Sequence, residues 1–131
     1  MLSGSCLCGA VAYEADAPLE SIAHCHCPTC RKAHGSAFSS VASIPREVFR
    51  WTRGKDKLSS FESSPGKFRR FCSNCGSQIF AERIDRPVVL LRLGCLDTPV
   101  NAKRQTHIWR SQAAKWYDPK IAWPEKPEGL W

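Results

Sequence analysis

The chain has 131 residues, of which 43% are hydrophobic and 24% charged, and its formal net charge is +7. These values are typical of one globular domain with a hydrophobic core, so we expect a single domain over residues 1–131 with its core at about 4–124. The longest aliphatic run, Val88–Leu91, is too short for a transmembrane helix, and the first residues lack a signal-peptide pattern. We therefore expect a cytoplasmic protein with no membrane partner.

Most of the chain has the alternating pattern of short β-strands. In chain order, strands are predicted at 10–15, 36–44, 48–54, 57–64, 77–84 and 88–94, and a turn at 63–67 lies between two such strand-like runs. Short helices are predicted from Pro28 to Ala33 and over 45–49. From Gln105 onward the pattern favours a strand and then an irregular segment, whose tryptophans are expected in the core or at its rim: Trp109, Trp116 and Trp123. The sequence thus predicts a mainly-β fold with at most two short helices.

Seven of the eight cysteines lie in closely spaced groups: Cys6-x-Cys8, Cys25-x-Cys27-x-x-Cys30 and Cys72-x-x-Cys75. In a reducing compartment such spacing indicates metal binding rather than disulfides, because a short loop brings two thiolates to one ion. The simplest partition combines the two pairs. Cys6, Cys8, Cys72 and Cys75 then form a closed four-cysteine site for a structural zinc.

The remaining group has three cysteines, one fewer than a structural zinc requires. If Cys25 and Cys27 lie on an extended segment, their side chains point to the same face, and Cys30 can return to them after a turn. Three thiolates would hold a zinc with one position open, which is typical of a catalytic zinc. This spacing predicts that Cys25, Cys27 and Cys30 are the ligands of a catalytic zinc ion.

A closed site of three cysteines and one histidine is the alternative. The same alternation sends His24 and His26 to the opposite face, so neither is an easy fourth ligand. His34 lies four residues after Cys30 and would share its face on a helix. The spacing alone leaves both sites possible.

The motifs resemble those of a known family. "GSCLCGAVAYEA", "HCHCPTCRKAHGSAF", "FRRFCSNCGSQIF", "LGCLD" and "HIWRSQAAKW" occur in the order found in the glutathione-dependent formaldehyde-activating enzymes, the family that also contains centromere protein V. The resemblance runs from about Gly4 to Pro124. It implies an Mss4-like fold, a β-tent of short antiparallel strands with zinc knuckles. It also implies two zinc ions per chain, divided among the cysteines as above.

The resemblance also implies a reaction, the combination of glutathione with formaldehyde to give S-(hydroxymethyl)glutathione. The enzyme class is a carbon–sulfur lyase, named for the reverse direction. A zinc bound by three thiolates carries a net charge of about −1 and is a weak Lewis acid, which favours sulfur chemistry over hydrolysis. We predict a zinc-dependent enzyme acting on a small thiol adduct such as that of glutathione.

Other residues are candidates for binding or proton transfer. Four cations flank the cysteine motifs and suit substrate carboxylates: Arg31, Lys32, Arg69 and Arg70. His107 is a candidate for catalytic proton transfer because its ordinary pKa lies near neutrality, and His34 is a candidate for substrate binding. Cys95 stands where the family more usually has a small hydroxyl residue, and it is expected to be a buried small side chain.

Two non-enzymatic functions are the alternatives. A zinc-stabilised scaffold can serve as a binding platform for a protein partner. Nucleic-acid binding is less favoured, because the basic residues are scattered and acidic residues intervene. An open coordination position on the zinc would distinguish an enzyme from a binding platform, because a platform does not need such a position. The three-thiolate site is expected to lose its zinc more easily than the four-thiolate site.

Overall fold

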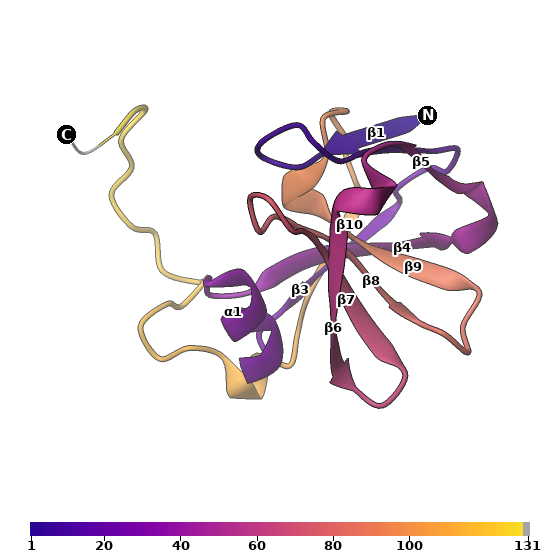
Figure 1. Cartoon of the computed structure of the whole chain (residues 1–131). Coiled ribbons are helices and arrows are strands. Elements are labelled where there is room, and N and C mark those ends of the chain that lie inside the picture. The colour runs from indigo at the N-terminus through magenta and orange to yellow at the C-terminus, as the bar shows by residue number, and fades with distance from the viewer. Residues whose placement is uncertain (130–131) are drawn as a thin grey trace.

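The computed structural model describes residues 1–129, whose strands form two sheets around one hydrophobic core (Figure 1). The small sheet has the order β1 (Leu2–Ser5), β2 (Ala12–Ala15), β5 (Phe49–Arg53). The large sheet has the order β10 (Arg104–Ile108), β3 (Ser21–Cys25), β4 (Ser39–Pro45), β9 (Val88–Arg92), β8 (Gln78–Arg83), β7 (Lys67–Cys72), β6 (Leu58–Ser64).

Helical structure in the described residues is limited to one α-helix and four single turns. The helix is α1 (Pro28–His34), as predicted, and proline at its first position suits a helix start. The predicted helix at 45–49 is a 3₁₀ turn over Arg46–Val48. The other 3₁₀ turns are Lys55–Lys57, Leu93–Cys95 and Arg110–Gln112. The mainly-β prediction is therefore confirmed.

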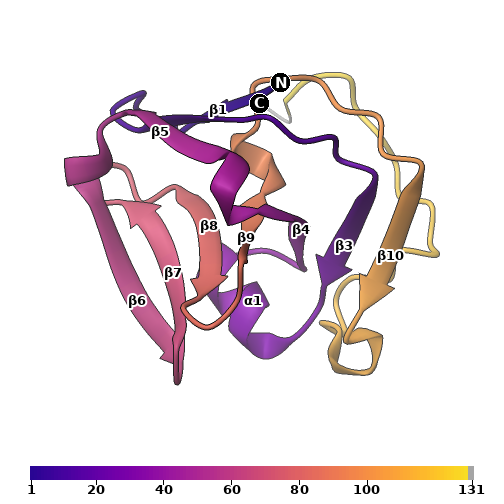
Figure 2. The same cartoon turned by 90° about the vertical axis from the view of Figure 1, so that its right-hand side faces the viewer.

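The strand pairing differs from the expectation in one respect. All strand pairs but one are antiparallel, whereas β10 lies parallel to β3, with His107 opposite His24 (Figure 2). β1 and β3 were not predicted from the sequence pattern. Their residues show little alternation, and long-range pairing rather than local preference makes them strands.

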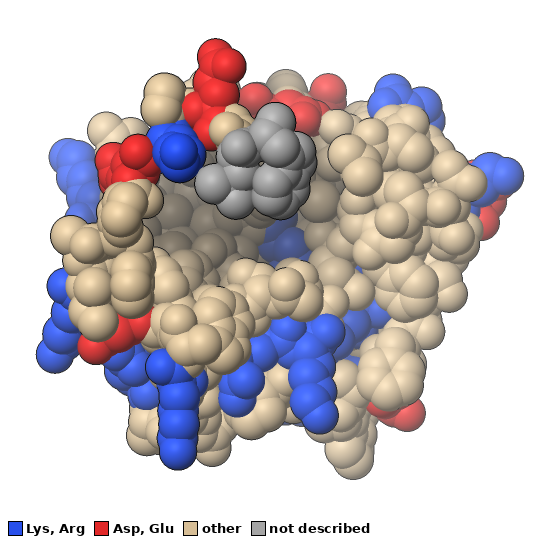
Figure 3. Space-filling model, turned by 90° about the vertical axis from the view of Figure 1, so that its left-hand side faces the viewer, with Lys and Arg blue, Asp and Glu red and all other residues tan. Residues whose placement is uncertain are grey.

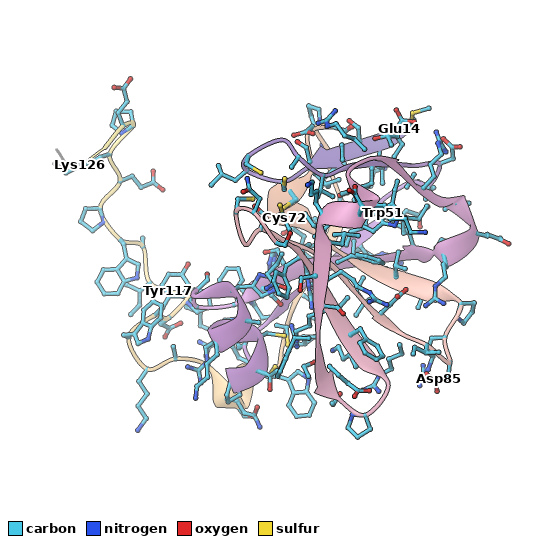
Figure 4. All side chains as sticks on the ribbon, viewed as in Figure 1. Glu14, Trp51, Cys72, Asp85, Tyr117 and Lys126 are labelled. Atoms are coloured by element: carbon cyan, nitrogen blue, oxygen red, sulfur yellow. The ribbon has the colours of Figure 1, made fainter. Side chains whose placement is uncertain are left out.

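The core lies between the two sheets. Tyr13 on β2 and Phe49 on β5 stack with ring centroids 5.0 Å apart, and Phe49 stacks on Phe80 of β8 at 5.1 Å. Trp51 adds edge-on contacts to this aromatic group, and Figure 4 shows it beneath the small sheet. The aromatic side chains therefore fasten the small sheet onto the large one.

The tryptophans of the C-terminal part are not in the core, contrary to expectation. Trp109, Trp116 and Trp123 are 58%, 69% and 54% exposed. Trp109 directly follows β10, whose residues are themselves exposed. Trp116 and Trp123 lie after the turn at Arg110–Gln112, where the described chain forms no further strand to cover them (Figure 1). Among the described residues, no helix has the length and apolar character to cross a membrane.

Gly54 is expected to be one of the least replaceable residues of the fold. Its φ is +72°, and an added Cβ would lie 1.9 Å from the Ala10 carbonyl oxygen, which is backbone and cannot move away. Gly66 has a φ of +77° with nothing within 4 Å of the same position. Gly66→Ala should therefore reduce the unfolding free energy by only about 1–2 kcal/mol, the cost of a left-handed conformation for alanine. Gly54→Ala should lose about 3 kcal/mol or more, since overpacking adds to it.

Urea denaturation of both variants measures this difference. Gly66→Ala is the matched control because it has the same substitution and nearly the same φ without the close approach. Equal losses in the two variants would contradict the prediction.

Candidate functional site

The first cysteine group lies where the two sheets meet. Cys6 and Cys8 follow β1, whereas Cys72 ends β7 and Cys75 lies in the next turn, and their four sulfur atoms are within 4.8 Å of one another. Figure 4 shows Cys72 with sulfur atoms beside it, below the loop that follows β1. This group ties residues far apart in the chain to one point.

The sulfur spacing of this group fits zinc. Cys6 Sγ lies 3.6 Å from Cys8 Sγ, and Cys8 Sγ lies 3.9 Å from Cys72 Sγ. A tetrahedron with Zn–S bonds of about 2.3 Å has edges of about 3.8 Å. The Val11 amide donates to Cys6 Sγ at 3.3 Å, and Cys75 Sγ lies 3.2 Å from Ser77 Oγ. The bonds from Ser77 lower the pKa of Cys75 to about 5, which favours ionised sulfur at that position.

The second group lies at the start of α1. Cys25 ends β3, Cys27 is the N-cap of α1 and Cys30 is in its first turn, with all three sulfur atoms within 4.8 Å of one another. Cys27 Sγ accepts a hydrogen bond from the Cys30 amide at 3.3 Å. The junction of strand and helix therefore brings the triplet together as the spacing predicted.

The three thiols differ in their electrostatic surroundings. Burial raises the pKa of Cys25 to about 12. Burial also acts to raise the pKa of Cys30, but contacts with Ser39, Cys27 and Arg69 outweigh it, so that this pKa is lowered to about 7. Arg69 Nη2 donates to Cys30 Sγ at 3.8 Å. The protein thus favours a thiolate at one corner of the triplet before a metal contributes.

No fourth protein ligand joins the triplet within residues 1–129. The described His, Cys, Asp and Glu side chains that come together there are only the three cysteines. His34 is half-buried and lies outside the group, and burial, followed by the charges of Arg92 and Arg69, lowers its pKa to about 4. This arrangement favours the open site over the closed one.

The other histidines lie on the opposite face of the sheet. His24 contacts Ser40 Oγ at 2.9 Å and Gln105 Oε1 at 2.8 Å. His26 is fully buried, and its Nε2 lies 2.8 Å from Nδ1 of His107. Burial, then the charge of His107, lowers the pKa of His26, and burial, then the charge of His24, lowers the pKa of His107. The side chain of His107 therefore joins the triplet segment by its contact with His26, and its part in proton transfer stays a prediction.

The predicted cations have different surroundings. Arg31 donates to the carbonyl oxygens of His26 and Gln112, each at 3.2 Å, so it joins α1 to the C-terminal segment. Arg70 forms a salt bridge with Glu82 at 2.7 Å. Lys32 lines a pocket of about 460 Å³ together with Arg69. Only these last two remain available to a substrate.

Cys95 belongs to neither sulfur group. It is half-buried and its thiol donates to the Gln78 carbonyl oxygen at 3.2 Å. Burial, followed by the charges of Cys6 and Cys75, raises its pKa to about 11. Cys95 is therefore a neutral thiol beside the four-cysteine group.

Arg92 is a buried residue near the triplet that was not predicted from the sequence. It lies at the end of β9 and is only 3% exposed. It lines a pocket of about 410 Å³ with His34, Ser39 and Gln78, beside the triplet. The sequence signal was an arginine within the apolar run from Val88 to Leu93. Arginine is rarely fully buried in a strand unless it has a partner.

Comparisons with known proteins show the family of the chain. The family described as glutathione-dependent formaldehyde-activating enzyme matches residues 1–112. Two curated proteins, each named "Putative glutathione-dependent formaldehyde-activating enzyme", are 30% identical over 105 residues, one from Colletotrichum graminicola and one from Penicillium rubens. The match covers 78% of this chain and 49% of each relative. The chain thus spans about half the length of these curated relatives.

A solved structure has the same fold. The crystal structure of a Rhodobacter sphaeroides protein superposes with a TM-score of 0.64 at 24% identity, covering 79% of this chain and 98% of that one. The two-sheet architecture is therefore shared with a structure determined by experiment.

Proposed function

Since the chain belongs to the glutathione-dependent formaldehyde-activating enzyme family, we propose that it is a zinc-dependent carbon–sulfur enzyme that forms S-(hydroxymethyl)glutathione from glutathione and formaldehyde. The observation that carries the proposal is the three-cysteine group at the start of α1, which has no fourth ligand among residues 1–129. A purely structural zinc would be expected to have four.

The proposed reaction is an addition. The sulfur of glutathione forms a bond with the formaldehyde carbon, the C=O double bond becomes a single bond, and the thiol proton ends on the oxygen. The reverse reaction is the lyase direction. The thiolate is the nucleophile, so the reaction is favoured where a thiol ionises near neutral pH.

The chain's own residues would bind and orient in this reaction. Cys25, Cys27 and Cys30 would hold the metal, and Cys6, Cys8, Cys72 and Cys75 would hold a second, structural ion. When bound at the triplet, zinc supplies a position that stabilises a thiolate at neutral pH. Arg69, which donates to Cys30 Sγ, offsets the negative charge of the three sulfurs. Lys32 and His34 remain proposed contacts for the substrate, from the two pockets beside the triplet.

Stepwise metal loading tests the proposal. The metal-free chain is titrated with zinc, and the rate of adduct formation above the uncatalysed rate is measured by NMR in the same buffer. The four-thiolate site should fill first because it has all its ligands. Catalysis should therefore be absent at one equivalent of zinc and appear with the second. Full activity at one equivalent, or none at two, would contradict the proposal.

Two further expectations concern the cellular compartment and the binding-platform alternative. All eight cysteines are free thiols, which suits a reducing compartment, and the proposal therefore includes the cytoplasm. The comparisons give no support to a non-catalytic binding platform.

A further inference from the structure

Two buried cations lie beside the cysteine triplet without an acidic partner. Arg69 is 4% exposed and Arg92 is 3% exposed, and neither forms a salt bridge in the part of the chain that is described. A buried charge costs several kcal/mol unless it is paired. An anion supplied by a bound ligand would remove that cost.

The strand register places Arg92 on the face that carries the triplet. Cys25 pairs with Ser39 across β3 and β4, and Val41 pairs with Arg92 across β4 and β9. Ser39 and Val41 are two residues apart on one strand, so their side chains share a face. Arg92 therefore lies on the same side of the sheet as Cys25.

The register places Arg69 there too. Arg69 pairs with Ala81, and Ala81 pairs with Leu90, which is two residues from Arg92. The direct contact from Arg69 to Cys30 Sγ agrees with this placement. Even with the three thiolates bound to a divalent metal, at a net charge of about −1, the two guanidiniums leave this face positive.

The free hydrogen-bond donors of Arg92 have a shape that suits a carboxylate. Nε and Nη2 of Arg92 are buried without a partner, and these two nitrogens form one edge of the guanidinium. The same edge of Arg70 donates to one carboxylate oxygen, Oε1 of Glu82, with distances of 3.3 and 2.7 Å from Nε and Nη2. The Nε–Nη2 edge of an arginine can bind both oxygens of a carboxylate in parallel. Nε and Nη1 of Arg69, which lie on different edges, and Nε2 of His34 are also buried without a partner.

We propose that Arg92 and Arg69 form a buried carboxylate-binding site beside the triplet, which takes a carboxylate of the thiol substrate. His34 lines the same 410 Å³ pocket as Arg92, and Lys32 lines the neighbouring pocket with Arg69. Figure 3 shows the side of the molecule with α1 and the C-terminal segment, where the surface is hollowed and Lys and Arg side chains gather below the hollow. This site selects thiols that carry a carboxylate, and it rests on the proposed function.

Calorimetric titration of the zinc-loaded full chain tests the site. The probes are glutathione and its derivative with both carboxylates converted to carboxamides, which has the same size and thiol. Wild type should bind glutathione at least about tenfold more tightly than the diamide. In Arg92→Gln the difference should fall to less than about threefold, with diamide binding unchanged. Arg86→Gln, at the exposed β8–β9 turn, is the control and should keep the wild-type difference.

Each outcome decides the proposal. Equal affinity for both probes in wild type, or an unchanged difference in Arg92→Gln, overturns the carboxylate site and leaves the proposed function intact. Binding of neither probe overturns both. The thermal midpoint of metal-loaded Arg92→Gln should equal or exceed that of wild type, since an unpaired buried charge is removed. A large fall in the midpoint would assign Arg92 a structural role and count against the site. If the variant does not fold, equal affinity of wild type for the two probes still overturns the site.

Discussion

Cys72→Ser is expected to abolish the folded state of the chain at room temperature. Cys72 is fully buried at the end of β7, and its sulfur belongs to the group that joins the N-terminal strand to the large sheet. Structural zinc sites contribute apparent free energies of about 10–16 kcal/mol at pH 7. This is as large as the whole stability of a domain, about 5–15 kcal/mol. Serine is a poor zinc ligand, so most of that contribution should be lost.

Circular dichroism and zinc content measure the effect of Cys72→Ser. The matched control is Cys95→Ser, since Cys95 is half-buried beside the same group without belonging to it. Cys95→Ser should keep two zinc ions per chain and the wild-type spectrum, because serine can make the same bond to the Gln78 carbonyl oxygen. A Cys72→Ser chain with two zinc ions and an unchanged denaturation midpoint would refute the structural site.

Cys27→Ser should lose at least about a hundredfold in turnover while the fold is retained. Loss of a partner outside the ligand shell costs 10–100-fold in metal affinity or activity, and Cys27 is itself a proposed ligand. The fold should survive for two reasons. Cys27 is only partly buried, and serine is a good N-cap that can replace its bond to the Cys30 amide. The change in unfolding free energy should stay within about 1 kcal/mol.

Three measurements on one preparation test Cys27→Ser: zinc per chain, the urea midpoint and the rate of adduct formation. One zinc ion, an unchanged midpoint and lost turnover are expected. Wild-type turnover with one zinc ion would show that the triplet has no part in catalysis. Unfolding of the variant would show instead that the triplet is a second structural site.

Local sequence pattern was sufficient for the parts of this protein that depend on short spacings. Cysteines two or three residues apart must lie close together in any fold, so the two pairs and the triplet could each be predicted as a group. The joining of the two pairs into one site followed from the four ligands of a structural zinc and not from their spacing. The helix after Cys27 followed from proline at its first position. The alternation of apolar and polar residues indicated most of the strands. The cysteine groups, the helix and the strands depend on residues that are close together in the sequence, so they can be predicted without the tertiary structure.

Only the tertiary structure decided which polar residues surround the triplet. Arg31, Lys32, Arg69 and Arg70 looked equivalent beside the cysteine motifs. Yet Arg31 binds backbone carbonyl oxygens and Arg70 binds Glu82, whereas Arg69 is buried against Cys30. Arg92 and His107 reach their positions through pairing between distant strands, and this pairing determines the face of the sheet on which each side chain lies. A shift of one residue in register would exchange the faces, and no local pattern encodes that register.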